Sequence, residues 1–345
     1  MRRERARLPR GATLAAFAAA LFLSSVSGRA GAYCRTTTCG LPAGFAPSAG
    51  ECYPPDFEER CASLDTPVKV LPLYWANACV SYDIQENASV QVPYAQAVTL
   101  FAAAFSQWTS TACPDDANGG HVSIQATDLG PVACDQVQYS ADQGNQHVII
   151  FHDDAWPHDD SSNTLGLTTI TFDPDTGEIY DADMEINSTP EIPLSLGDPP
   201  AGGYDFQSII QHETGHFLGL AHSGEPGATM LARYTPGTTS MRTLSSDDIA
   251  GICSVYLADG DRAVATSVAA SGLVAPDACD PAPRHGFQSE CAQPVPPDSG
   301  PKCSLAGAPG MPQGDGRGNL AATGALVAAI SALFASRRRR ASARA

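Results

Sequence analysis

Residues Gln211–His222, which read Q-H-E-T-G-H-F-L-G-L-A-H, constrain this chain more than any other segment. His212 and His216 are four residues apart, so on a helix both imidazoles project from one face and can bind the same ion. Gly219 adopts backbone angles that other residues resist, which lets the chain turn and bring His222 back as a third ligand. Three neutral imidazoles leave a fourth position for water, the arrangement of a catalytic zinc site.

The same residues have a second interpretation, because His-Glu-x-x-His also recurs on ordinary amphipathic helices with solvated or core histidines. Gly219, His222 and a methionine eight residues later, Met230, favour the metal site. Asp205 is a good N-cap, so we predict a helix that begins after Asp205 and ends before Gly219. Glu213 lies one step round this helix from the ligands, beside the metal.

The motif and Met230 resemble the metzincins and, within them, the matrixins. The segment from Leu244 to Ile252, followed by Tyr256, is similar to the matrixin C-terminal helix, and Trp108 at the end of a predicted helix fits the same layout. The resemblance covers about Thr66 to Tyr256. It implies an α+β zincin fold: a twisted, mostly parallel five-stranded sheet with one antiparallel edge strand, and three helices. It places the active-site cleft along that edge strand and Met230 in the Met-turn beneath the zinc.

Metal chemistry on this layout predicts a zinc metalloendopeptidase. Zinc polarises the scissile carbonyl and lowers the pKa of its bound water toward ~7. Glu213 takes the proton as the water attacks and passes it to the leaving amine. An extended substrate adds as a strand to the sheet edge. Tyr234 either assists the oxyanion or is a packed tyrosine.

Two other function classes use the same scaffold. One is a catalytically silent surface protein, against which the intact Glu213 argues. The other is a zinc-dependent deacylase or amidase. The third histidine, His222, and the methionine Met230 favour peptide cleavage over that chemistry.

Acidic residues crowd the segment from 173 to 185, which resembles the calcium-holding stretch of matrixins. Hard oxygen ligands suit calcium, whereas a solvated acidic loop is the alternative interpretation. His152 and His158 lie near the place where matrixins bind a structural zinc, although the rest of that ligand pattern is missing. The candidate calcium ligands are Asp175, Asp181, Asp183 and Glu185.

All 11 cysteines follow a predicted export signal, so disulfides are the default expectation. Without Cys303, which falls in the C-terminal segment, ten remain that can all pair. Because Cys279 and Cys291 are close in the sequence, a disulfide between them is the easiest pairing to predict. Cys39 and the three residues after it resemble the matrixin cysteine switch, but the flanking residues differ, so an ordinary disulfide is favoured there.

Both ends of the chain carry targeting signals. Arginines precede an apolar run from Ala12 to Val26 and a small-residue cleavage site at Ala30-Gly31-Ala32, which together predict a signal peptide over residues 1–32. An N-terminal anchor is the alternative. Leu320 to Ala335 is apolar, spans about 24 Å as a helix and precedes four arginines, which predicts a single-span anchor. Together with Cys303, this end also resembles a MYXO-CTERM sorting tail.

The charge distribution restricts the partners. The chain has a formal net charge of −17, and residues 33–301 contain seven Lys and Arg against 35 Asp and Glu. Such a surface repels nucleic acid and anionic lipid headgroups. We therefore expect protein or peptide substrates, no nucleic acid, and membrane contact only through the C-terminal segment. The expected location is outside the cell or on its surface.

Composition divides the chain into five segments, and periodicity predicts elements within the third. The segments are the signal peptide (1–32), a Cys-rich segment (33–65), the matrixin-like domain (66–258), a Pro-, Ala- and Ser-rich linker (259–302) and the sorting or anchor segment (303–345). The predicted elements are strands at Ala78–Ile84, His121–Ala126, His147–Phe151 and Leu167–Phe172, and a helix over Tyr94–Ser110.

Overall fold

The computed structural model describes most of the chain between residues 32 and 292. Of the predicted signal peptide it describes Ala32, and of the predicted tail the backbone of 324–331; the remainder of both lies outside the described residues. The described residues are 32–42, 45–48, 50–114, 116, 119–264, 273–292 and 324–331.

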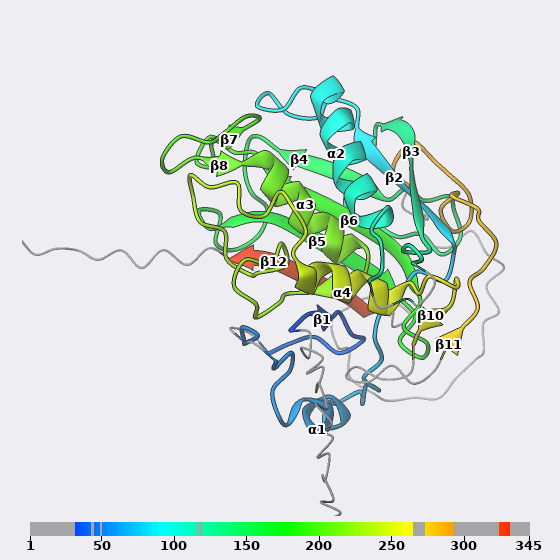
Figure 1. Ribbon diagram of the computed structural model, residues 1–345. Helices are drawn as coiled ribbons and strands as arrows, with labels where there is room; N and C mark the ends of the chain where they lie inside the picture. Colours follow the sequence, from blue (N-terminus) through cyan, green and yellow to red (C-terminus); the bar gives the residue numbers. More distant parts are fainter. Residues whose placement is uncertain are drawn as a thin grey trace, which may run out of the picture. The chain divides into compact units, whose positions relative to one another are not determined.

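A six-stranded sheet lies at the centre of the fold (Figure 1). Its strand order is β12-β5-β6-β4-β2-β3, in which β5 is antiparallel to both of its neighbours and the other pairs are parallel. Apart from β12, this is the predicted five-stranded sheet with one antiparallel edge strand. The strands are β2 (Cys79–Gln85), β3 (Gln125–Val132), β4 (Val148–His152), β5 (Thr164–Phe172), β6 (Ile179–Asn187) and β12 (Gly324–Ser331).

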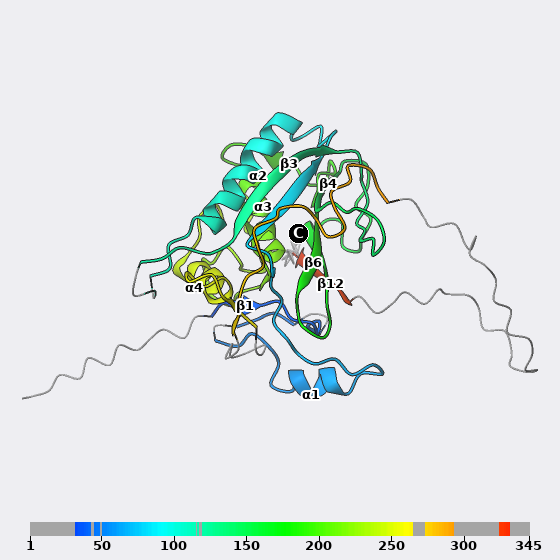
Figure 2. The same cartoon turned by 90° about the vertical axis from the view of Figure 1, so that its right-hand side faces the viewer.

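Three helices belong to the domain in the described part of the chain, as predicted, and α2 and α3 cover one face of the sheet (Figures 1 and 2). The Asp205 side chain caps α3 by accepting a hydrogen bond from the Ser208 backbone N–H at 2.9 Å. Ser245 and Asp248 form a capping box that starts α4. The helices are α2 (Tyr94–Thr109), α3 (Phe206–Phe217) and α4 (Ser246–Val255), with the short α1 (Phe57–Ala62) in the Cys-rich segment.

Short two-residue strands complete the described elements. Two of these strands, β1 and β9, pair antiparallel, which places the start of the described chain beside the turn that follows α3. The short strands are β1 (Cys34–Arg35), β7 (Leu194–Ser195), β8 (Tyr204–Asp205), β9 (Leu220–Ala221), β10 (Arg262–Ala263) and β11 (Leu273–Val274).

The core between helices and sheet is rich in aromatic side chains. Trp108 of α2 is completely buried, and its indole Nε1–H donates to the Gln211 carbonyl of α3 at 2.9 Å. Tyr82 of β2 stacks on Phe105 of α2 with ring centroids 4.1 Å apart. The aromatic side chains of this helix are therefore core, and they fix the position of α3 over the sheet.

Strand β6 corrects the expectation of an acidic loop. Its acidic residues alternate with Ala182, Met184 and Ile186, which are buried in the core shared with the helices. This period of two is the pattern of a strand, in which successive side chains point to opposite faces. The carboxylates of β6 therefore lie on the face of the sheet away from the helices.

Strand β3 forms later in the sequence than predicted. The apolar residues of His121–Ala126 indicate an earlier strand, but the ladder with β2 runs from Gln125 to Val132. The strand includes Pro131, which has no backbone N–H to donate. Because β3 is the last strand of the sheet, the lost donor faces no partner strand, and proline is tolerated there.

The apolar segment Leu320–Ala335 was expected to be helical, but residues 324–331 form strand β12. This strand runs antiparallel to β5, with Ala328 opposite Thr168. An edge strand exposes unpaired backbone N–H and C=O groups, and a second strand satisfies them. Within the described residues, no helix has the length and apolarity needed to cross a membrane. The predicted transmembrane helix is thus not supported.

The ten described cysteines all form disulfides, as the predicted export of the chain implies. Cys39 pairs with Cys61, so the ordinary disulfide expected at this position is confirmed and no free thiol is present there to act as a cysteine switch. The other pairs are Cys34–Cys52, Cys79–Cys279, Cys113–Cys253 and Cys134–Cys291.

Two of these disulfides tie residues 273–292, here called the C-terminal extension, to the sheet. The expected pairing of Cys279 with Cys291 is wrong, because the extension passes along the domain instead of turning back on itself. Near its start Asp277 bridges to Asn77, and near its end it pairs with the segment between β3 and β4. This part of the predicted linker therefore belongs to the domain.

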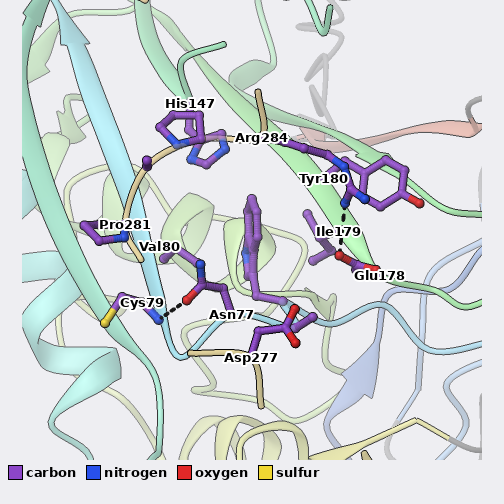
Figure 3. A pocket seen from close by; sticks show the side chains of 14 residues that line it. Asn77, Cys79, Val80, His147, Glu178, Ile179, Tyr180, Asp277, Pro281 and Arg284 are labelled. Atoms are coloured by element: carbon purple, nitrogen blue, oxygen red, sulfur yellow. Dashed lines mark hydrogen bonds and ion pairs between the residues drawn. The ribbon is translucent and has the colours of Figure 1, made fainter. Parts of the chain in front are cut away.

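A cavity of about 340 Å³ lies where the extension crosses the ends of β2 and β6 (Figure 3). On one wall, the Arg284 guanidinium of the extension lies 3.8 Å from the centre of the Tyr180 ring and 3.1 Å from the Glu178 carboxylate. Cation–π and ionic contacts thus add to the disulfides in holding the extension against β6.

Removing one disulfide tests how much this attachment stabilises the domain. Replacing both Cys79 and Cys279 by Ala should lower the free energy of unfolding by about 2 to 5 kcal/mol, because the bond restricts the unfolded chain. The matched double variant at Cys34 and Cys52 should lose less, since its bond closes a sequence separation of 18 instead of 200. Urea unfolding measures both, and an equal or smaller loss for the first pair would contradict this account.

Candidate metal centre

Three imidazoles converge where α3 ends. His212 and His216 lie on one face of the helix, and Gly219 ends it with a φ of 89°, in the left-handed region that favours glycine. A Cβ at Gly219 would lie 3.0 Å from the Leu73 carbonyl oxygen, so the turn also needs the small residue. The turn returns His222, and ligand atoms of all three histidines lie within 4.8 Å of one another.

Backbone carbonyls orient the two helical imidazoles. His212 Nδ1 lies 2.7 Å from the Thr229 carbonyl, and His216 Nδ1 lies 2.8 Å from the Leu220 carbonyl. A carbonyl only accepts, so each Nδ1 carries the hydrogen and each Nε2 presents a lone pair. The two Nε2 atoms are 3.0 Å apart, and the buried Nε2 of His222 has no partner among the described residues. Lone pairs this close repel, and a shared cation relieves the repulsion, so the donor set fits zinc.

The surroundings keep these three side chains neutral. Burial lowers the pKa of His216 to about 4 and that of His222 to about 3. Burial, reinforced by the neighbouring imidazoles, lowers the pKa of His212 well below its usual range. Metal ligation requires neutral imidazoles, so the site is prepared for an ion at neutral pH.

Glu213, the residue after His212 on α3, is completely buried. Its Oε2 accepts a hydrogen bond from the Thr168 hydroxyl at 2.7 Å, and its Oε1 has no partner in the described part of the chain. In the metal-free chain, burial raises the pKa of Glu213 to about 8, opposed by the hydrogen bond from Thr168. A dication held by the histidines would favour the ionised form of this carboxyl.

Met230 packs beneath the centre of α3. A Cβ on Gly215 would lie 2.3 Å from the Met230 sulfur, so the methionine sits directly against the helix backbone between two of the histidines. The Asp248 carboxylate of α4 accepts hydrogen bonds from the backbone N–H groups of Thr229 and Met230, at 2.8 and 3.0 Å. Asp248 therefore holds this turn, a role that the sequence pattern did not reveal.

Tyr234 is a packed residue. Its side chain is buried, and its hydroxyl accepts from the Asp205 backbone N–H at 2.9 Å and donates to the Thr238 carbonyl. Arg242 contacts both carboxylate oxygens of Asp205, at 2.9 and 2.6 Å. The loop between Met230 and Arg242 is thus fastened to the residue that caps α3.

The four candidate calcium ligands do not converge. Asp175 is exposed in the turn between β5 and β6. The other three lie within β6, where the side chains of Asp181 and Asp183 contact each other and Glu185 has other partners. Within the described ranges, the histidines at the end of α3 are the one group of three or more potential ligands this close together. Glu185 instead lies between His152 and His158, with one carboxylate oxygen 2.8 Å from each Nε2.

The other two candidates, Asp181 and Asp183, are buried together with the Asp83 carboxylate on the face of the sheet away from the helices. Asp183 accepts hydrogen bonds from the backbone N–H groups of Gln138 and Val148, both at 2.9 Å. Asp83 and Asp181 each keep one oxygen without a partner among the described residues. Burial raises the pKa of Asp83 to about 7 and those of Asp181 and Asp183 well above their usual range.

The raised pKa of Asp83 predicts a pH-dependent stability. In the folded protein this carboxyl stays protonated up to about pH 7, whereas in the unfolded chain it ionises near its usual pKa of 3.8. Its contribution to stability is therefore complete below pH 3.8 and is lost as the pH rises to about 7. Asp83→Asn removes this loss. The free energy of unfolding of this variant should therefore rise relative to that of the wild type between pH 3.8 and about 7, by at most about 4 kcal/mol.

Urea unfolding at several pH values, with a chelator present so that zinc release does not interfere, measures this gain. The exposed Asp142→Asn provides the control and should show a constant difference from the wild type. A constant difference for Asp83→Asn as well would show that this carboxyl does not carry the pH dependence.

Comparison with known proteins identifies the domain. A profile of the matrixin peptidase family matches residues 74–257, just over half of the chain. Metalloendoproteinase 1-MMP of Arabidopsis thaliana is 27% identical over 183 residues, which are 53% of this chain and 44% of that protein. Matrilysin of Homo sapiens is 36% identical over 105 residues (30% and 36%), and neutrophil collagenase of Homo sapiens is 32% identical over 130 residues (38% and 25%). The chain spans less than half the length of these relatives.

The matched region runs from the start of the sheet to the end of α4. It includes the converging histidines, the glycine turn between them and the methionine beneath α3. The fold and the sequence profile agree, and the chain belongs to the matrixin family.

Proposed function

We propose that this chain is a zinc metalloendopeptidase that hydrolyses peptide bonds of extracellular proteins. The observation that carries the proposal is the convergence of three neutral imidazoles, with a buried carboxylate on the same helix next to the first of them. His212, His216 and His222 would hold the ion. Bound zinc would supply a Lewis acid that polarises the scissile carbonyl and acidifies water. The similarity to proteins named metalloendoproteinase, matrilysin and collagenase supports this reaction class.

Glu213 supplies the proton transfers in this proposal. Its partner-free Oε1 takes a proton from the attacking water, and the same carboxyl returns the proton to the leaving amine. The buried position keeps bulk water from competing for that proton. Met230 contributes by packing under α3, so it keeps the histidines in place without binding the ion.

The outer edge of β5 is the proposed substrate-binding strand. Residues 324–331 already pair with it, which supports the idea that this edge accepts an added strand. A substrate peptide would take their place and would therefore compete with the C-terminal segment. The loop from Leu231 to Met241, fastened through Arg242, would shape the pocket for the side chain that follows the scissile bond.

Export and surface attachment form part of the proposal. Five disulfides support an oxidising compartment, and the predicted signal peptide and C-terminal sorting segment supply the route and the attachment. The proposal includes no calcium site, because the four candidate ligands are distributed over a turn and a strand.

Cleavage of an unfolded protein such as casein tests the proposal. The wild-type chain should cleave it with about one zinc bound, whereas Glu213→Gln should retain the zinc and lose roughly 10²- to 10⁴-fold in kcat. Glu225→Gln, at an exposed position shortly after the third histidine, is the matched control and should behave as wild type.

The same assay separates the rival classes. Bound zinc without cleavage by the wild type would contradict the endopeptidase proposal and favour a silent scaffold. Hydrolysis of small N-acyl amides but of no peptide would favour an amidase. Absence of bound zinc would overturn the metal centre itself.

A further inference from the structure

We propose that Thr168 is a positioning residue for Glu213: its hydroxyl holds one carboxylate oxygen so that the other is presented to the attacking water. The inference rests on the proposed function, in which Glu213 is the base. It assigns a role in that reaction to a residue that lies outside the metal-binding motif and on a different element.

The contact joins a strand to the catalytic helix. Thr168 is completely buried in β5, and its Oγ1 lies 2.7 Å from Glu213 Oε2 and 3.4 Å from the Glu213 carbonyl. A carboxylate only accepts, so the hydroxyl donates, and hydrogen bonds to an ionised acceptor are the stronger kind. β5 is paired on both sides, and a β-branched side chain is stiff at χ1. The donor is therefore held by the sheet and not by a loop.

Gly166 provides an independent observation on the same carboxylate. It lies two residues before Thr168 on β5, on the same face of the strand. A Cβ at Gly166 would lie 2.8 Å from Glu213 Oε1 and 2.9 Å from Glu213 Cγ, closer than such atoms pack. The strand thus leaves room for Oε1 at one position and binds Oε2 at the next position on that face.

Together these two residues fix which oxygen is free. Glu213 Oε2 is occupied by Thr168, whereas Oε1 has no partner among the described residues. A carboxylate held in this way does not need to rotate before it accepts a proton, and such preorganisation accelerates the chemical step more than it strengthens substrate binding. The effect of losing Thr168 should therefore appear in kcat.

The first experiment is a set of single substitutions in the zinc-loaded full chain with a peptide substrate. Thr168→Val keeps the shape and removes the hydroxyl, and it should lower kcat roughly 10- to 100-fold with KM and zinc content unchanged. Thr168→Ser keeps the hydroxyl and should remain near wild type. Thr99→Val makes the same change at an exposed position on α2, away from β5, and is the matched control. Gly166→Ala should lower kcat with zinc retained, because the new methyl group displaces the carboxylate.

The second readout does not depend on turnover. The carboxyl carbon of Glu213 is observed by ¹³C NMR in chain labelled at glutamate, and its signal is assigned as the one absent from Glu213→Gln. Thr168→Val should shift this signal in both zinc-free and zinc-loaded protein. Thr168→Ser and Thr99→Val should leave it in place.

The outcomes separate the inference from the proposed function. Unchanged kcat and an unmoved signal in Thr168→Val would overturn the inference and leave the endopeptidase standing. A signal that moves only in Thr168→Val, in a chain that cleaves no peptide, would support the positioning role and contradict the proposed function. Equal losses of kcat in Thr168→Val and Thr168→Ser, with the signal unmoved, would show a packing role and also overturn the inference.

Discussion

The close approach of three neutral imidazoles is the constraint on which the rest of the structure depends. Two of their Nε2 atoms lie 3.0 Å apart in a buried site, an arrangement that is unfavourable without a cation between them. The surrounding fold maintains it from several directions. Gly219 turns the chain against the Leu73 carbonyl, the backbone carbonyls of Thr229 and Leu220 orient the rings, and Asp248 fixes the turn beneath them. All of these contacts except the one between His216 and Leu220 join residues more than 15 positions apart in the sequence.

Strand β5 links the metal centre to the proposed substrate edge. One of its sides pairs with β6 inside the sheet, and the other is the edge that residues 324–331 occupy. On its helix-facing side, the Thr168 hydroxyl donates to the Glu213 carboxylate and Gly166 leaves room for it. A peptide bound along this strand would therefore be registered against the same backbone that positions the base, so substrate alignment and proton transfer share one rigid element.

Sequence spacing predicted the features that depend on local geometry. The helix after Asp205 and the return of His222 follow from helical periodicity and one glycine, and helix α2 follows from the same period. β6 was missed because its alternating carboxylates resemble a calcium loop more than a half-buried strand. The partner of Cys279 and the role of Thr168 depend on contacts across 200 and 45 residues, which no local pattern encodes.

X-ray absorption at the zinc edge of the zinc-loaded full chain tests the central claim most directly. The account predicts three imidazole nitrogens and one oxygen at about 2.0 to 2.1 Å, and no sulfur at about 2.3 Å. A sulfur ligand would mean that a cysteine reaches the ion despite the disulfides. Fewer than three imidazoles would mean that the convergence at the end of α3 is not a metal site, and either result would contradict the account.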